Sequence, residues 1–205
     1  YKSNLQLNFF KDTCMNDHNV QEKIIKSPED YARFYEIKEK NGVKIIDLFC
    51  GCGGFSLGFS RAGYDILAGI DSDKDSLETF KSNLQTKGLE IDLSSDGWIN
   101  LLQSEINNSP VDVLIGGPPC QGFSLTGTRV FDDPRNILYK AFFDGIDHLN
   151  PKFILLENVK GMATLYQGQA LKTIIKELEK REFRVSFEVL NSSLFGVPQV
   201  RERLF

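Results

Sequence analysis

The residue of this sequence best placed to act as a nucleophile is a cysteine on a rigid loop. Cys120 ends the segment GGPPC, residues 116–120, which directly follows the apolar run Val111–Ile115. Two glycines and two prolines fix a sharp turn after a buried strand, where loops commonly carry functional side chains. A structural cysteine normally sits inside a helix or strand, whereas a thiol presented on such a loop can be reactive. We therefore expect Cys120 to take part in covalent chemistry.

A carboxylate and two arginines follow at positions where they can share a pocket with this thiol. The apolar run Phe153–Leu156 leads directly into Glu157, so that a potential proton donor stands at the end of a neighbouring strand. Near the end of the sequence, Arg201 and Arg203 lie on the same side of an extended segment. Taken alone, that arginine pattern is more often a solvated, charged strand.

A glycine-rich turn after the first apolar run favours a nucleotide-like ligand. The sequence DLFCGCGGF, residues 47–55, contains glycines that allow a tight turn and a close approach of the backbone to a ligand. A dinucleotide fingerprint needs a glycine where Ser56 stands, which disfavours a nicotinamide dehydrogenase. Asp71, roughly 20 residues further on, can accept hydrogen bonds from ribose hydroxyls. An adenosine-containing ligand is indicated, and a purely structural glycine turn is the alternative.

Composition limits the class of protein. The chain has 205 residues, of which 41% are hydrophobic, enough for one main domain with a short appendage. Its net charge of −4 argues mildly against a polyanionic partner. No apolar run is long enough to span a membrane and no signal peptide is recognisable, so we expect a cytoplasmic protein.

The cysteines predict neither disulfides nor a metal site. Four cysteines, at positions 14, 50, 52 and 120, are too few and too irregularly spaced for a disulfide framework. Cys50 and Cys52 form a CGC motif, but two thiols do not complete a set of four ligands, and His18 and His148 are distant in the sequence. We expect small residues lining a turn.

Alternating apolar runs and amphipathic stretches predict an α/β fold with a mostly parallel sheet flanked by helices. The expected strands are Val43–Phe49, Tyr64–Ile70, Val111–Ile115, Phe153–Glu157 and Phe183–Leu190. The expected helices are Phe55–Ala62, Lys74–Asn83, Trp98–Ile106, Arg135–His148 and Gln169–Lys180. Right-handed crossovers place the loops after the strands on one edge, where ligands bind in such folds. The glycine turn, Cys120 and Glu157 should therefore share that edge.

Residues 1–42 differ in character from residues 43–205. They are polar, and Ser27-Pro28-Glu29-Asp30 has the sequence of a helix start. The sequence predicts a helix over Pro28–Lys40, ended by Asn41-Gly42, that packs against the main domain. The expected organisation is a helical extension of residues 1–42 followed by a catalytic domain of residues 43–205.

Taken together, these segments resemble the DNA cytosine-5 methyltransferase family. The resemblance covers about Val43 to Phe205 and rests on four motifs in the family's order and approximate spacing. These are the cofactor loop at 47–54, the nucleophile loop GPPCQ at 117–121, the acid motif ENV at 157–159 and the arginine motif QVRER at 199–203. The resemblance implies a Rossmann-like methyltransferase fold that uses S-adenosylmethionine.

The resemblance also implies catalytic roles. Cys120 would add to C6 of cytosine, Glu157 would hydrogen bond or protonate N3, and Arg203 would hold O2 of the base. Arg201 would steady the Cys120 loop or bind a phosphate. The cytosine would be flipped out of double-stranded DNA. Further substrate contacts are expected from residues within or beside these motifs, namely Gln121, Ser124, Asn158 and Gln199.

Cofactor contacts are implied for residues at the same edge, namely Asp47, Phe49, Gly51, Gly53, Gly54, Asp71, Ser72, Asp92 and Pro119. Phe49 would pack against adenine and Asp71 would accept the ribose hydroxyls. Asp71 and Ser72 stand where the family usually has a glutamate and a bulky apolar residue. Spacing favours Asp92 over Asp96 for the adenine amino group.

In the family, a target-recognition region and a last helix follow the arginine motif. The resemblance therefore implies a fragment, a truncated product, or one half of a split enzyme with a separate C-terminal polypeptide that carries target recognition. A restriction–modification companion acting at the prokaryotic nucleoid is the expected setting. Two alternatives remain open: the same chemistry on tRNA, and a non-catalytic remnant that binds an adenosine ligand.

Overall fold

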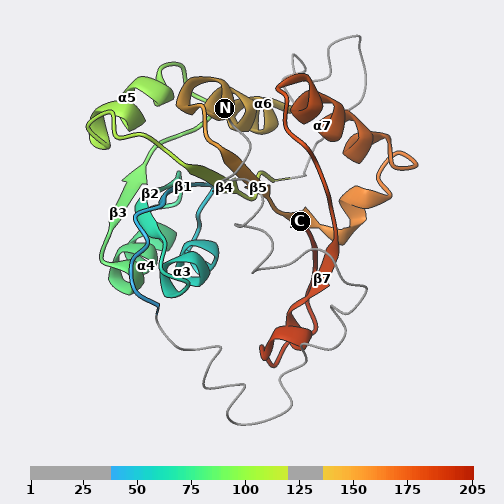
Figure 1. Cartoon of the computed structure of the whole chain (residues 1–205), viewed down its shortest axis with the longest axis horizontal. Helices are drawn as coiled ribbons and strands as arrows, with labels where there is room; N and C mark the ends of the chain where they lie inside the picture. Colours follow the sequence, from blue (N-terminus) through green and yellow to red (C-terminus); the bar gives the residue numbers. More distant parts are fainter. Residues whose placement is uncertain (1–37, 120–135) are drawn as a thin grey trace. The chain divides into compact units, whose positions relative to one another are not determined.

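A computed structural model describes residues 38–119 and 136–205 of the chain (Figure 1). The described residues belong to two units. The larger unit contains those up to Leu190 together with Glu202–Phe205, and the smaller unit contains Asn191–Arg201. Most of the predicted helix Pro28–Lys40 lies outside the described residues. Its last residues are described and are not helical. Their backbone instead bonds to the end of the helix Gly54–Arg61 and to the turn after it, where Lys38 N–H donates to Arg61 O at 2.9 Å and Asn41 N–H donates to Gly63 O at 2.8 Å.

A five-stranded parallel sheet forms the centre of the larger unit. Its order is β3-β2-β1-β4-β5. The strands are β1 (Lys44–Leu48), β2 (Asp65–Asp71), β3 (Lys87–Glu90), β4 (Val113–Gly116) and β5 (Phe153–Leu156), and each neighbouring pair is parallel. The chain builds outward from β1 through β2 to β3 and then returns to the other side of β1 with β4. Strand order thus reverses between β1 and β4, the place where folds of this type bind ligands.

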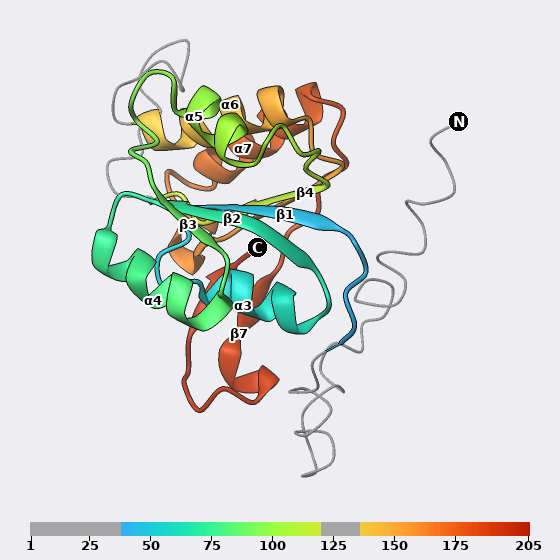
Figure 2. The same cartoon turned by 90° about the vertical axis from the view of Figure 1, so that its left-hand side faces the viewer.

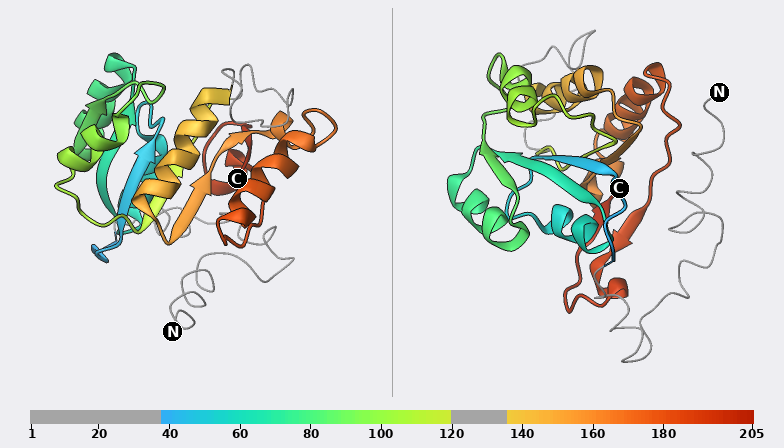
Figure 3. Two further views of the ribbon diagram at one scale, coloured as in Figure 1. Left: turned by 90° about the horizontal axis from the view of Figure 1, so that it is seen from above. Right: turned by 60° about the vertical axis from the view of Figure 1, so that its left-hand side comes forward.

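Helices cover both faces of this sheet, as Figures 2 and 3 show from several sides. One face carries α3 (Gly54–Arg61) and α4 (Lys74–Leu84), and the other carries α5 (Trp98–Glu105), α6 (Ile137–Leu149) and α7 (Gln169–Lys180). These five helices and four of the five main strands confirm the predicted elements within two residues at each end. Among the described residues, none of the helices has the length and apolar character needed to cross a bilayer.

Two hydrophobic clusters fill the space between the sheet and its helices. Leu102, Leu114 and Phe142 belong to the cluster that involves α5, α6 and α7, and each is fully buried. Ile115 and Phe80 belong to the second cluster, which involves α3 and α4. β4 contributes to both, because successive side chains of a strand point to opposite faces. The apolar run that precedes the GGPP turn is therefore fixed from both sides.

A second, three-stranded sheet has the order β6-β8-β7. Its strands are β6 (Asn158–Val159), β8 (Glu202–Leu204) and β7 (Val189–Asn191), with the short 3-10 helices η4 (Lys160–Ala163) and η5 (Ser192–Phe195) between them in sequence. The predicted strand Phe183–Leu190 is mostly wrong, since residues 183–188 lie outside any strand. Phe183 and Val185 pack against the hydrophobic core, so the alternating pattern here reflects the burial of side chains and not the pairing of a strand.

Candidate active site

The expected site residues of the larger unit lie at, or just beyond, the carboxyl ends of the parallel strands. Phe49 follows β1, Asp71 ends β2, Asp92 follows β3, Pro119 follows β4 and Glu157 follows β5. Parallel strands end at a common edge of the sheet, so the fold brings these residues to one side of the molecule. Asp92 reaches this edge because β3 pairs with β2. This pairing continues just beyond β3, where Ile91 N–H donates to Asp71 O at 3.0 Å.

The glycine-rich turn between β1 and α3 has a backbone that leaves room for a ligand. Phe49, Gly51 and Gly53 have φ angles of 61°, 49° and 85°. A Cβ atom at Gly53 would lie 2.6 Å from the Phe80 ring, so this glycine is needed for packing against α4. By contrast, a Cβ atom at Gly51 or Gly54 would meet nothing within 4 Å. The positive φ of Phe49 is unusual for a bulky side chain, and such strain concentrates at ligand sites.

The Asp71 carboxylate organises this turn. One oxygen accepts the N–H of Gly51 at 2.8 Å and the other accepts the N–H of Asp73 at 3.0 Å. A carboxylate oxygen has more than one lone pair, so both oxygens retain capacity for a further hydrogen bond. Asp71 is half-buried, whereas the neighbouring Ser72 is exposed. Asp71 can therefore support the glycine turn and also accept hydroxyl groups of a ligand.

Asp92 stands at the same edge with a fixed carboxylate. Its Oδ1 accepts the backbone N–H of Ser94 at 2.8 Å and the Ser94 hydroxyl at 2.6 Å. These hydrogen bonds hold the pKa of Asp92 below its ordinary value, so that the exposed side chain is ionised at neutral pH. An ionised carboxylate accepts hydrogen bonds only, which suits contact with an amino group.

Asp47 lies inside the fold, beneath the glycine turn. Its side chain is 1% exposed, and its carboxylate accepts the hydroxyl of Ser56 at 2.7 Å. Burial raises the pKa of Asp47 to about 7, and the hydrogen bonds from Ser56 limit this rise. Ser56, which stands where a dinucleotide fingerprint needs a glycine, is also fully buried and is the hydrogen-bond partner of this acid. Asp47 thus joins the end of β1 to the first turn of α3.

The CGC motif contains one buried and one exposed thiol. Cys50 is 7% exposed, and burial, together with the negative charges of Asp47 and Asp71, raises the pKa of its thiol well above the ordinary range. Cys52 is exposed. Over residues 38–119 and 136–205, no group of three or more His, Cys, Asp or Glu residues could hold a metal ion. Cys50 is therefore a packing residue rather than a reactive thiol.

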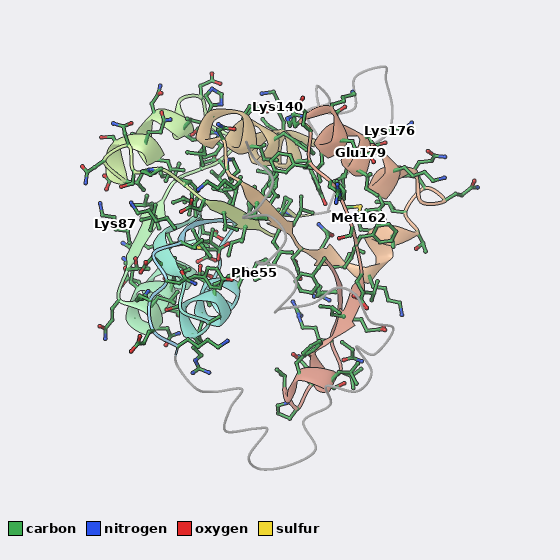
Figure 4. All side chains as sticks on the ribbon, in the orientation of Figure 1. Phe55, Lys87, Lys140, Met162, Lys176 and Glu179 are labelled. Atoms are coloured by element: carbon green, nitrogen blue, oxygen red, sulfur yellow. The ribbon has the colours of Figure 1, made fainter. Side chains whose placement is uncertain are left out.

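Glu157 and Arg203 form an ion pair at the end of β5. Arg203 Nε lies 2.9 Å from Glu157 Oε1, and both side chains are about three-quarters buried, with exposed fractions of 23% and 25%. The antiparallel pairing of β6 with β8 places Arg203 opposite Val159, two residues beyond Glu157. Phe205 packs edge-on against Phe55 of α3, which is labelled in Figure 4, with ring centroids 5.9 Å apart. The strand pairing and this ring contact thus hold the backbone on either side of Arg203.

The carboxylate of Glu157 lies directly against the glycine-proline turn. Glu157 N–H donates to Gly116 O at 2.9 Å. A Cβ atom at Gly117 would lie 2.9 Å from Glu157 Oε2, so a side chain at this position would push the Glu157 carboxylate out of its place. Because Gly117 has no side chain, the Glu157 carboxylate can lie directly beside the turn that precedes Cys120.

Asn158 is buried and makes its hydrogen bonds within the chain. It is 4% exposed, and its Nδ2 donates to Pro118 O at 2.8 Å and to Tyr139 Oη at 2.6 Å. Its Oδ1 accepts the N–H of Val159 at 2.8 Å. Sequence reasoning missed Tyr139, because an aromatic residue in the apolar stripe of α6 gives no signal of a polar role.

The other expected site residues are placed only in part. Cys120, Gln121 and Ser124 lie outside the described residues. Gln199 and Arg201 belong to the smaller unit. Within this unit the Ser192 hydroxyl donates a hydrogen bond to Gln199 O at 2.7 Å, and the Ser192 N–H donates to Arg201 O at 2.9 Å.

Comparison with known proteins agrees with this geometry. The family model described as C-5 cytosine-specific DNA methylase matches residues 43–205. Type II methyltransferase M1.HphI of Haemophilus parahaemolyticus is 44% identical over 163 residues, which cover 78% of this chain and 44% of that protein. Type II methyltransferase M.AquIA of Picosynechococcus sp. is 38% identical, over 79% of this chain and 70% of that protein.

Solved structures give the same result. A DNA modification methyltransferase encoded within an E. coli prophage has 31% identity and a TM-score of 0.66, over 80% of this chain and 45% of that chain. The S. pombe Dnmt2 methyltransferase shares the fold, with a TM-score of 0.62 at 22% identity and coverage of 80% and 48%. The chain thus spans about half the length of most of these relatives. The resemblance inferred from the four motifs is confirmed, and the chain belongs to the C-5 cytosine-specific DNA methylase family.

Proposed function

We propose that this chain is the part of a type II DNA methyltransferase that binds S-adenosylmethionine and carries out methyl transfer to C5 of cytosine. The observation that carries the proposal is the Glu157–Arg203 ion pair, held against the turn that leads into Cys120. An acid, a guanidinium and a cysteine loop at one sheet edge match what attack on a pyrimidine ring requires.

The proposed chemistry begins at the cysteine. The Cys120 thiolate adds to C6 of the flipped base and forms an S–C6 bond, while negative charge develops on the ring. Glu157 lies where a carboxyl group can hydrogen bond N3 and offset that charge, and Arg203 keeps this carboxyl aligned and offers its remaining N–H groups to O2. After C5 has gained the methyl group, loss of the C5 proton to a base or to water expels the thiolate and restores the ring.

The cofactor supplies an electrophilic methyl group on a sulfonium, and the glycine edge fits such a ligand. The space beside Gly51 and Gly54 is open, so the backbone can approach the methionine part closely. Asp71 would accept the ribose hydroxyls, Asp92 the adenine amino group, and Phe49 would pack on the adenine ring. Asp47 is too deeply buried to touch a ligand, and we assign it to the support of the turn.

Target recognition is proposed to come from a further segment. The matched region covers 44% of M1.HphI but 70% of M.AquIA, so relatives differ widely in how much they add to this part. That segment would follow in the same chain or be supplied as a separate polypeptide, and it would provide much of the basic surface for double-stranded DNA. In a prokaryotic restriction–modification system the enzyme would act in the cytoplasm on the nucleoid.

Covalent trapping tests the proposal. The chain is incubated with S-adenosylmethionine and DNA containing 5-fluorocytosine, with and without a C-terminal segment taken from a relative. Fluorine at C5 blocks the final elimination, so an adduct at Cys120 should persist and be mapped by mass spectrometry. Cys120→Ser should abolish the adduct, and the matched control Cys14→Ser, outside the residues that match the family model, should leave it intact. No adduct with either arrangement would overturn the proposal, and an adduct only with fluorinated tRNA would reassign the substrate.

A further inference from the structure

The Asn158 side chain connects the two loops of the candidate active site. Its amide donates to Pro118 O at 2.8 Å, and Pro118 stands two residues before Cys120 in the sequence. Asn158 also directly follows Glu157. The loop that leads to the nucleophile and the loop that carries the acid are therefore joined through one buried amide group.

Tyr139 supplies the last hydrogen-bond partner of this amide. The Pro118 carbonyl can only accept, so the NH₂ group of Asn158 must face it. The second N–H of that group then needs an acceptor, and Tyr139 Oη provides it at 2.6 Å. The amide oxygen is already used by Val159 N–H. With the amide turned over, its oxygen would face the Pro118 carbonyl oxygen and both donors would lose their acceptors.

Tyr139 is itself held firmly. It is 1% exposed and lies in α6, where its neighbour Lys140 is labelled in Figure 4. α6 packs on the main sheet through Phe142 and Ile146, both in the core. The phenol oxygen is therefore a fixed point, supplied by a helix that carries none of the four family motifs.

We propose that Tyr139 is a positioning residue for methyl transfer, which acts through Asn158 to hold the Pro118 backbone in place beside Glu157. The proposal rests on the function proposed above, since it assigns Tyr139 to the same site. Removal of the phenol oxygen would leave one buried N–H of Asn158 without its acceptor, and the bond to Pro118 would weaken as the amide rearranges.

The test compares Tyr139→Phe with Tyr64→Phe, which removes a phenol oxygen at the opposite, amino-terminal end of β2. The enzyme is studied in the form in which the wild-type chain produces the Cys120 adduct. Tyr139→Phe should lower kcat by roughly tenfold, with KM for S-adenosylmethionine and for DNA changed less than about twofold. Tyr64→Phe should match the wild type. In an Asn158→Ala background, Tyr139→Phe should have little further effect, because it acts through that amide.

A wild-type kcat for Tyr139→Phe, or an undiminished effect in the Asn158→Ala background, would overturn the assignment. Hydrogen exchange of a peptide that spans residues 116–120, followed at the Gly117 and Cys120 amides because the two prolines between them carry no N–H, provides a readout that does not need catalysis. Tyr139→Phe should raise its deuterium uptake, and Tyr64→Phe should not. Absence of an adduct with the wild type would show that the proposed function is wrong. Unchanged deuterium uptake in Tyr139→Phe would separately show that Tyr139 does not hold this turn.

Discussion

The burial of Asp47 makes the stability of the fold depend on pH. Its carboxyl group is 1% exposed, with the Ser56 hydroxyl as a partner and the negative charge of Asp71 nearby. Burial raises the pKa of this group from an ordinary 3.8 to about 7 in the folded chain. Between these two values the folded protein binds more protons than the unfolded protein. The free energy of unfolding must therefore fall as pH rises through this interval and become constant above it.

The size of the effect follows from the two pKa values. The shift corresponds to about 4 kcal/mol in total, and about 2 to 3 kcal/mol of it is lost between pH 5 and pH 8. Asp47→Asn cannot ionise, yet its amide oxygen can still accept the Ser56 hydroxyl. The stability of this variant relative to the wild type should therefore rise by about 2 to 3 kcal/mol from pH 5 to pH 8.

Equilibrium unfolding in urea at fixed ionic strength measures this difference. All other ionisable groups are common to the two proteins, so their contributions cancel in the comparison. Asp92→Asn is the matched control, since the pKa of the exposed Asp92 is lowered and its titration is complete below pH 5. Parallel stability curves for the wild type and Asp47→Asn over this range would refute the reasoning.

Three further predictions concern the site itself. Gly117→Ala should reduce methyl transfer at least about tenfold with a small change in Tm, because its Cβ would displace the Glu157 carboxylate; unchanged single-turnover rates would contradict this. Arg203→Lys should lower kcat about 10- to 100-fold, since an ammonium cannot reproduce the guanidinium contact, and full activity would exclude this alignment. Iodoacetamide at pH 8 should label Cys52 and spare Cys50 in the folded chain, as judged by mass spectrometry, whereas equal labelling would show that Cys50 is not buried.

The sequence predicted most of the main sheet and its helices because their patterns are local. The run that became β4 is apolar throughout, and Ile45, Ile46 and Leu48 give β1 a mainly apolar run, as is typical of strands buried on both faces. β3 was missed because KGLE, with two charged ends and a glycine, has no strand pattern and forms only by pairing with β2. The stretch Phe183–Leu190 was predicted as a strand on its alternation, yet only its end pairs with β8.

The sequence by itself determined the chemical groups of the site, because four ordered motifs name the cysteine, the acid, the arginines and the glycine turn. The tertiary structure alone decided how these groups are supported. Asp47 finds Ser56 across the turn from β1 to α3, and Asn158 finds Tyr139, 19 residues away, and Pro118, 40 residues away. Buried polar groups must find partners, but local sequence does not encode which distant group the fold will bring within reach.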